Sequence, residues 1–366
     1  MADAKQDQQR EVTKAEVLAA LSQVQDPDLH RDIVSLGFIK DSDINICGDN
    51  VSVTIMLTTP ACPVREQMKS QAEELLLALP GVSHAEVHMD ADVRSTQARS
   101  GQPVEGVRNI IAVASNKGGV GKSTVAVNLA IALSKCGARV GLLDADITGP
   151  NVPTMMGLPP GFQADRGLAV EERYGVRVAS IGFLLKPGTP VVWRGPMIGS
   201  GVRQLLHDVP WAEEGELDYL VIDLPPGTSD ASMSMAQEAP IAGVVIVTTP
   251  QAVSLEDAAK AVTMFEKLNV PVFGVIENMS YFACPHCGER TDIFGHGGAA
   301  AAAEELGLDF LGEVPIDVAV RQGGDEGVPI VQSDPDSAVS KALLEIAQKI
   351  AARTSVQHFF AQPASV

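Results

Sequence analysis

The sequence predicts an α/β fold in which a large, mostly parallel β-sheet is sandwiched by helices and preceded by a small α/β domain. The first observation is a series of short runs that are apolar on both faces, which is typical of strands covered by helices on each side. The second is that segments with helical spacing separate these runs. The third is a polar stretch with Gly and Pro near residue 100, which divides the chain.

The elements of the small domain follow from local patterns. Thr13 and Glu16 have the spacing of a capping box, and strict alternation from Val51 to Leu57 predicts a half-buried strand. The expected order is a helix ending near residue 25, this strand, a helix over 63–79 and a strand over 82–89.

The large domain is expected to begin directly after the polar stretch. Its apolar runs are 109–115, 139–143, 219–222, 243–248 and 272–276, and its clearest helical segments are 125–135 and 255–268. We therefore assign residues 1–92 to the small domain, 93–106 to a linker, 107–353 to the large domain and 354–366 to a flexible tail.

Composition restricts the classes of partner. The chain has 366 residues and a formal charge of −19, so it repels phosphate backbones and anionic lipid headgroups. It has no apolar run of about 18 residues, and its amino terminus lacks a targeting pattern. Five cysteines are too few for a disulfide framework. We expect a cytoplasmic protein that binds neither nucleic acid nor membrane.

A glycine-rich loop follows the first apolar run of the large domain and precedes a helix. It spans Ser115–Ser123, with the sequence Ser-Asn-Lys-Gly-Gly-Val-Gly-Lys-Ser. Such glycines let backbone N–H groups converge on phosphate oxygens, and the helix N-terminus adds partial positive charge. Lys122 is expected to reach the β- and γ-phosphates of ATP, and the Ser123 hydroxyl to bind Mg²⁺.

The loop departs from the strict phosphate-loop pattern at Asn116, where that pattern has Gly; Asn tolerates left-handed backbone angles better than most residues. A glycine-rich turn without a nucleotide is the simpler alternative. The strand–loop–helix context favours a P-loop NTPase. The residues expected to contact the nucleotide are Gly118, Gly119, Val120, Gly121, Lys122, Ser123 and Thr124.

Lys117 is a second lysine in this loop. The loop resembles the deviant Walker A motif of the MinD/ParA/ArsA/nitrogenase-iron-protein class. The resemblance implies an ATP-dependent homodimer in which Lys117 reaches the nucleotide of the partner and acts in catalysis with Lys122. Without the resemblance, Lys117 is a solvated loop lysine.

Carboxylates follow two other apolar runs. Asp144 and Asp146 end one run, and Asp223 ends another ahead of Leu-Pro-Pro-Gly, in the Walker B arrangement that holds Mg²⁺. By similarity to the class, Asp146 positions or activates the attacking water and Asp144 supports Mg²⁺. Asn278 resembles the residue whose amide contacts the adenine edge in that class.

The sequence Cys284-Pro-His-Cys287 has the spacing of a metal or redox site. Three interpretations compete. A zinc site needs two more ligands, for which His286 and His296 are the nearest candidates. A redox pair normally opens a helix, whereas Gly288 follows here. A dimer-bridging iron–sulfur cluster takes two thiolates from each protomer.

The combination of motifs is similar to the Mrp/ApbC family of iron–sulfur cluster carrier ATPases. The similarity rests on the Lys117 loop, on Asp223–Thr228 and on Glu277–Ser280 followed by the cysteine pair. It implies a homodimer that bridges a [4Fe–4S] cluster through Cys284 and Cys287, hydrolyses ATP and delivers the cluster to apoproteins. Cluster-assembly scaffold proteins are then further partners.

Two alternatives come from the same ATPase class. A positioning ATPase of the MinD or ParA kind needs basic surface for lipid or DNA, and the chain shows no added basic run at its end. A reductase like the nitrogenase iron protein has cluster ligands far apart in sequence. Neither accounts for the closely spaced cysteine pair.

The small domain also has a family resemblance. Asp26–Asp28 and Thr58–Pro63 resemble the small domain of cytosolic iron–sulfur assembly factors. Cys62 is expected at the start of a helix, where the dipole favours the thiolate. A role in cluster handling and a simple packing role both remain open for it, whereas Cys47 and Cys136 are expected in the core.

Overall fold

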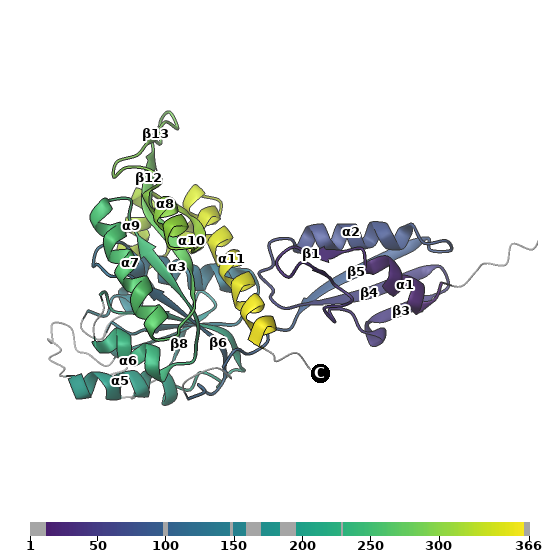
Figure 1. Cartoon of the computed structure of the whole chain (residues 1–366), viewed down its shortest axis with the longest axis horizontal. Coiled ribbons are helices and arrows are strands. Elements are labelled where there is room, and N and C mark those ends of the chain that lie inside the picture. The colour runs from purple at the N-terminus through teal and green to yellow at the C-terminus, as the bar shows by residue number, and fades with distance from the viewer. Residues whose placement is uncertain are drawn as a thin grey trace, which may run out of the picture. The chain divides into compact units, whose positions relative to one another are not determined.

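The computed structural model describes residues 12–97, 102–146, 149–158, 170–183, 195–227 and 230–361. The chain forms two compact units, Met1–Val93 and Arg94–Val366 (Figure 1). Each unit has its own sheet and is described by itself.

The small unit is a three-stranded sheet with two helices. The strands are β3 (Ile44–Cys47), β4 (Asn50–Leu57) and β5 (His84–Ala91), and the helices are α1 (Lys14–Leu21) and α2 (Arg65–Leu77). The remaining short elements are β1 (Gln25–Asp26), β2 (Arg31–Asp32) and η1 (Asp41–Asp43). Strand β4 pairs antiparallel with β3 and parallel with β5.

Both local patterns of the small unit are confirmed. Thr13 caps α1 in a full capping box, with the Thr13 backbone N–H donating to Glu16 Oε2 at 2.9 Å. Every second residue of β4 is buried. Helix α1 ends at Leu21 rather than near residue 25, because residues 25–26 pair with residues 31–32 as strands.

The large unit contains a mostly parallel sheet, as predicted. Its strand order is β13-β12-β11-β6-β10-β7-β9-β8, with β14 paired to β12. The parallel strands are β6 (Val107–Ala114), β7 (Val140–Asp144), β9 (Val176–Ser180), β10 (Leu217–Asp223), β11 (Ile241–Thr248), β12 (Val272–Ala283) and β14 (Phe310–Ile316). The two antiparallel strands are β8 (Glu171–Arg173) and β13 (Arg290–Thr291).

Helices cover both faces of this sheet (Figure 1). One face packs against α3 (Lys122–Lys135), α11 (Ala338–Ala361), α4 (Val152–Met155) and α10 (Ile330–Ser333). The other packs against α5 (Gly195–His207), α6 (Asp230–Glu238), α7 (Ala252–Lys267) and α8 (Gly298–Glu305). Helix α9 (Val318–Glu326) contacts α4 and α10, and the short turn η2 (Ile181–Phe183) follows β9.

Helix α11 continues past the expected end of the domain. It runs to Ala361, although residues 354–361 were expected in the flexible tail. The physical reason is packing: Thr354 is buried, and its hydroxyl donates to the Ile350 carbonyl at 2.9 Å. Residues 362–366 lie outside the described part of the chain.

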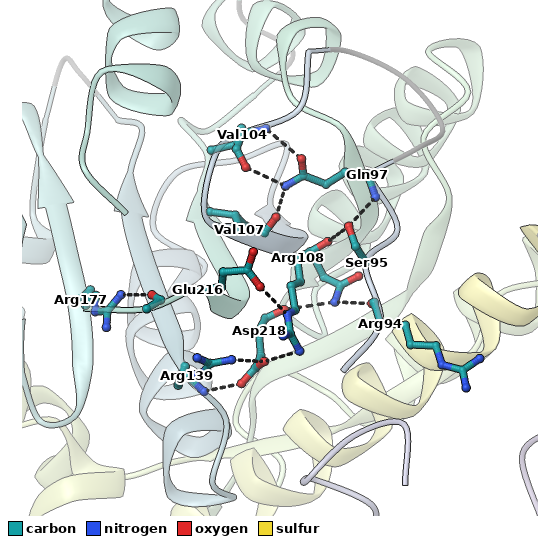
Figure 2. A network of polar contacts seen from close by, with 12 residues as sticks. Arg94, Ser95, Gln97, Val104, Val107, Arg108, Arg139, Arg177, Glu216 and Asp218 are labelled. Carbon is teal, nitrogen blue, oxygen red and sulfur yellow. Dashed lines mark hydrogen bonds and ion pairs between the residues drawn. The ribbon is translucent and has the colours of Figure 1, made fainter. Parts of the chain in front are cut away.

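The segment expected as a linker is bonded to the large unit where it is described. Figure 2 shows Gln97 beside Val104 and Val107. The Gln97 amide donates to the carbonyls of both residues and accepts the Val104 N–H at 2.9 Å. Gln97 is buried, as is Asn109, whose amide donates to the Arg94 carbonyl at 3.0 Å and to the Asp218 carbonyl at 3.1 Å.

Charged side chains continue this network along the amino-terminal edge of the sheet. Arg108 contacts Glu216 at 3.2 Å and Asp218 at 3.5 Å, and Arg139 contacts Asp218 at 3.4 Å (Figure 2). Because β6, β7 and β10 begin at these residues, the network lies at the edge opposite the glycine-rich loop.

The contacts of Gln97 lead to a stability prediction. Gln97→Ala removes hydrogen bonds and leaves the buried Val104 N–H without its partner, so it lowers the free energy of unfolding by about 1–3 kcal/mol. Urea denaturation followed by circular dichroism measures the change. Gln102→Ala, an exposed position in the same segment, is the matched control and leaves stability unchanged. Equal stabilities for the two variants contradict the buried role of Gln97.

Candidate nucleotide site and cysteine hairpin

The glycine-rich loop lies between the carboxyl end of β6 and the start of α3. Gly121 is the N-cap of α3 and has a left-handed backbone with φ of 84°, which only glycine adopts without strain. The loop bounds a pocket of about 300 Å³. Its lining residues are Ser115, Lys117, Gly118, Gly119, Gly121, Lys122, Ser123, Thr124, Asp146, Asn151 and Pro226.

Most of the residues predicted to contact the nucleotide line this pocket. Val120 does not, because its side chain is buried and its carbonyl faces Asn278. Lys117 and Asp146, two of the three predicted catalytic residues, meet Lys122 in the pocket wall. Of the loop after β10, Pro226 lines the pocket, and Thr228 lies outside the described residues.

A buried acidic pair lies next to the pocket. Asp144 ends β7 and Asp223 ends β10, and the two residues are register partners in neighbouring parallel strands. Both are almost fully buried, and Lys122 forms an ion pair with Asp223. Asp144 accepts hydrogen bonds from the Ser180 hydroxyl at 3.0 Å and from the backbone N–H groups of Val152 and Asp146, each at 3.2 Å.

The electrostatics of this pair fit a cation. Burial, reinforced by the neighbouring Asp223, raises the pKa of Asp144 to about 8. Burial also raises the pKa of Asp223, although the Lys122 ammonium opposes this. The raised pKa of Asp144 favours its protonated form when no cation is present, whereas a divalent cation that displaces the proton would stabilise the carboxylates that bind it. Ser123 lies in the same wall, with its hydroxyl 3.3 Å from the Lys122 ammonium.

A second pocket of about 490 Å³ adjoins the first. The two share Gly121, Ser123, Thr124 and Asn151. The other lining residues are Thr154, Met155, Asn278, Met279, Pro315, Ile316, Asp317, Val320, Arg321, Gly324 and Asp325. The pocket at the phosphate loop thus opens into a second, more apolar pocket, which suits the ribose and base of a nucleotide.

Asn278 joins the wall of the second pocket to the phosphate loop. Its amide nitrogen donates to the Val120 carbonyl at 2.8 Å, and its side chain is buried. A Cβ atom at Gly121 would overlap this amide, so glycine is needed there for a second reason. The predicted contact with adenine remains a proposal, and the structure adds a contact with the phosphate loop itself.

Sequence analysis missed the wall formed by β14 and α9. Pro315, Ile316 and Asp317 lie at the carboxyl end of β14, and the Asp317 carboxylate caps α9 by accepting the Ala319 N–H at 2.8 Å. The signal was present, because apolar residues before a capping aspartate mark the end of a strand. Because β14 was not among the predicted strands, Asp317 could not be placed at the carboxyl edge of the sheet beside the pocket.

Asn116, the departure from the strict loop pattern, has a structural partner. Its amide donates to the Asp257 carboxylate of α7 at 3.4 Å. The Lys260 ammonium lies 3.0 Å from the same carboxylate and is the main cause of its lowered pKa; Asn116 and the positive charge of Lys117 lower that pKa further. The amide therefore ties the amino-terminal half of the loop to α7.

The cysteine pair occupies the tip of a β-hairpin between β12 and β13. The Cys284 N–H donates to the Glu289 carbonyl at 3.0 Å, and the Gly288 N–H donates to the Cys284 carbonyl at 2.8 Å. Backbone N–H groups of His286 and Cys287 lower the pKa of the Cys284 thiol, which favours the thiolate form that binds metal.

The hairpin supplies too few ligands for a metal site within one chain. No group of three or more His, Cys, Asp or Glu side chains that could hold a metal ion occurs in the described ranges. His296, a candidate zinc ligand, instead accepts a hydrogen bond from Arg290 at 2.7 Å. A hairpin tip also differs from the helix start expected for a redox pair.

Comparison with known proteins now adds to this geometry. A family model described as NUBPL iron-transfer P-loop NTPase matches residues 106–351. The chain belongs to this family. The small unit matches a second family model, iron-sulfur cluster assembly protein, over residues 14–89. Both resemblances predicted from the motifs are confirmed.

Relatives of the NUBPL-family chain match along nearly its whole length. An iron-sulfur cluster carrier protein from Synechocystis is 48% identical, covering 94% of this chain and 99% of the relative. A protein of the same name from Deinococcus radiodurans is 47% identical, covering 93% and 95%.

Solved structures agree with the fold. A nucleotide-binding protein from Archaeoglobus fulgidus, solved with ADP, is 43% identical with a TM-score of 0.53, covering 61% of this chain and 88% of its own. The cell division ATPase MinD from Pyrococcus furiosus has a TM-score of 0.50 at 24% identity, covering 66% and 98%. The MinD likeness shows the fold alone.

The remaining cysteines of the NUBPL-family chain correct three expectations. Cys62 lies before α2 rather than in its first turn, and burial, with the carboxylates of Asp26 and Asp28 nearby, raises the pKa of its thiol to about 11. The thiolate is therefore disfavoured. Cys47 is exposed at the end of β3, and Cys136 is half-buried as the C-cap of α3, so neither is a core residue.

None of the helices in the described ranges is both long enough and apolar enough to cross a bilayer.

Proposed function

We propose that this chain carries iron–sulfur clusters and transfers them to apoproteins, as a homodimer that binds and hydrolyses ATP. The observation that carries the proposal is the hairpin with two cysteines and no further ligand in the described part of the chain, on the same strand as Asn278 of the nucleotide pocket. Family membership and the names of the relatives support it.

The cargo is proposed to be a [4Fe–4S] cluster shared between two protomers. Such a cluster takes four thiolates, and each chain offers the pair Cys284 and Cys287 at one exposed tip. Two copies related by a two-fold axis bring two identical pairs together. The lowered pKa of Cys284 favours the thiolate form that binds iron.

The nucleotide site is proposed to hydrolyse ATP by positioning and charge neutralisation. The loop N–H groups and Lys122 hold the phosphates, and Ser123 with Asp223 holds Mg²⁺, which neutralises phosphate charge when bound. Asp144, the register partner of Asp223, would support the cation. Asp146 lies in the pocket wall, where its carboxylate orients the attacking water. Lys117 of one protomer contacts the phosphates held by its partner.

The partners and location complete the proposal. Cluster-assembly scaffolds are the donors and apoproteins the recipients. We propose the cytoplasm as the location, although related proteins named for chloroplasts and mitochondria occur in plants. A spatial-positioning ATPase is not favoured, because its only support is likeness of fold and the net charge of −19 opposes binding to lipid or DNA.

The cysteine pair is tested by anaerobic reconstitution with iron and sulfide. Cys284→Ala and Cys287→Ala are each expected to lose the cluster, because two of its four thiolates disappear from every dimer. Cys136→Ala is the matched control and retains it. Iron and sulfide per chain and transfer to an apo-ferredoxin are the measurements. Full cluster content in Cys284→Ala, or stoichiometric zinc without sulfide in the wild type, overturns the proposal.

The role of Lys117 across the dimer is tested by mixing inactive variants. Lys117→Ala and Lys122→Ala alone are each expected to lower ATP hydrolysis by about a thousandfold. An equal mixture regains about a quarter of wild-type activity, because half of the dimers are mixed and each of these has one complete site. Lys135→Ala, on the exposed face of α3, is the control with full activity. No recovery in a mixture shown to exchange subunits places Lys117 in its own site.

A further inference from the structure

Strand β12 is the common element of the nucleotide pocket and the cysteine hairpin. Asn278 and Met279 line the pocket, and Cys284 follows the end of the strand at Ala283. Only four residues therefore separate the pocket wall from the first cysteine. A displacement of the backbone at Met279 therefore also displaces Cys284, unless the residues between them change conformation instead.

The strand is irregular between these two points. Asn278 pairs with Val314 of β14, and the next pair is Phe282 with Ile316, so β12 has two extra residues in this interval. Pro315 stands opposite the bulge and has no N–H to donate to it. Met279 has φ of 55°, a left-handed conformation that is uncommon for a residue other than glycine. The bulge is thus the place where the hairpin could move independently of the sheet.

Glu277 fixes the near side of the bulge. Its side chain is fully buried, and it accepts the Ser280 hydroxyl at 2.6 Å and the Ala299 N–H of helix α8 at 2.8 Å. The Glu277 carboxylate therefore joins Ser280 on the other side of Met279 to the N-terminus of α8. Negative charge is favoured at a helix N-terminus.

Arg290 fixes the far side. Arg290 is the register partner of Ala283, the residue that directly precedes Cys284. Its guanidinium lies over the Tyr281 ring at 4.0 Å from the centroid, and it donates to Asp292 at 2.8 Å and to His296 Nδ1 at 2.7 Å. A further bond at 3.1 Å reaches Glu313 of β14. One side chain thus joins the bulge, both sides of the hairpin loop and the neighbouring strand.

Strand β14 closes the connection. Glu313 lies two residues before Pro315, which lines the nucleotide pocket together with Ile316. The guanidinium therefore connects the hairpin to both strands that form the pocket wall. A planar group with several donors and an aromatic face contact can make these bonds together, whereas a lysine ammonium cannot reproduce that geometry.

We propose that Arg290 is a positioning residue that couples the nucleotide pocket to the cysteine hairpin, through Glu313 on β14 and Tyr281 in the bulge. Nucleotide contact with Met279 and Pro315 changes the hairpin through this link and so changes how firmly Cys284 and Cys287 hold their cargo. This deepens the proposed function and rests on it for the identity of the cargo.

The coupling is tested first without any cluster, by hydrogen–deuterium exchange of the full-length apo chain with and without Mg²⁺ and ADP. In the wild type, ADP is expected to change the exchange rate of the amides of residues 281–291 by about tenfold. In Arg290→Ala the change falls to less than about twofold, whereas ADP affinity stays the same. Arg290→Lys gives an intermediate effect.

Two further variants make the result specific. Glu313→Gln weakens the bond between Arg290 and Glu313 from the β14 side. If Arg290→Ala does not fold, this variant tests the coupling in its place. Arg203→Ala removes another arginine–carboxylate pair of the large unit, the one with Glu238, and behaves like the wild type. An unchanged ADP response in folded Arg290→Ala or Glu313→Gln contradicts the proposal, as does a wild-type hairpin that does not respond to ADP.

A second measurement uses the loaded protein. Release of iron to a chelator is expected to be about tenfold faster from Arg290→Ala and to lose its dependence on nucleotide. Equal, nucleotide-dependent release from wild type and variant contradicts the coupling. A wild type that holds no cluster overturns the proposed function instead, and the exchange experiment on apo protein still decides the role of Arg290.

Discussion

The hydrogen bond from the Asn278 amide to the Val120 carbonyl is the contact on which the site depends most. It measures 2.8 Å, is buried, and attaches β12 to the phosphate loop. Gly121 must be glycine because a Cβ there would overlap this amide. The loop position and the position of β12 are thereby fixed to each other. Since β12 ends at Ala283, directly before Cys284, one strand joins the nucleotide site to the cysteine pair, with the bulge between them.

The parallel sheet brings together the acidic pair beside the phosphate loop. Adjacent strands in register bring Asp144 and Asp223 together at the carboxyl edge, where burial raises the pKa of both. Lys122 forms an ion pair with Asp223. In the proposed function, a cation bound beside these carboxyls would stabilise their ionised form, and the loop N–H groups would hold the phosphates.

Local patterns were enough to predict the capping box at Thr13, the parallel sheet and the residues around the phosphate loop. The seven strands that were predicted have ends within two residues of the expected ones, except for β12, whose second half pairs with a hairpin strand of two residues. The other strands, among them β3, β9 and β14, were not predicted. The β14 wall of the pocket was missed although Asp317 marks the end of that strand. The contacts of Arg290 were not predictable, because they join residues far apart in sequence through side-chain geometry. The exposure of Cys47 and the raised pKa of Cys62 also depend on tertiary surroundings that spacing does not encode.

The central claim is that one cysteine pair is half of a site completed by a second copy of the chain. Native mass spectrometry of the anaerobically reconstituted protein tests this directly, because it reports chain number and cluster mass in one species. The account predicts an ion of two chains with one [4Fe–4S] cluster and a cluster-free monomer. A single chain that carries a cluster or a zinc ion would contradict it.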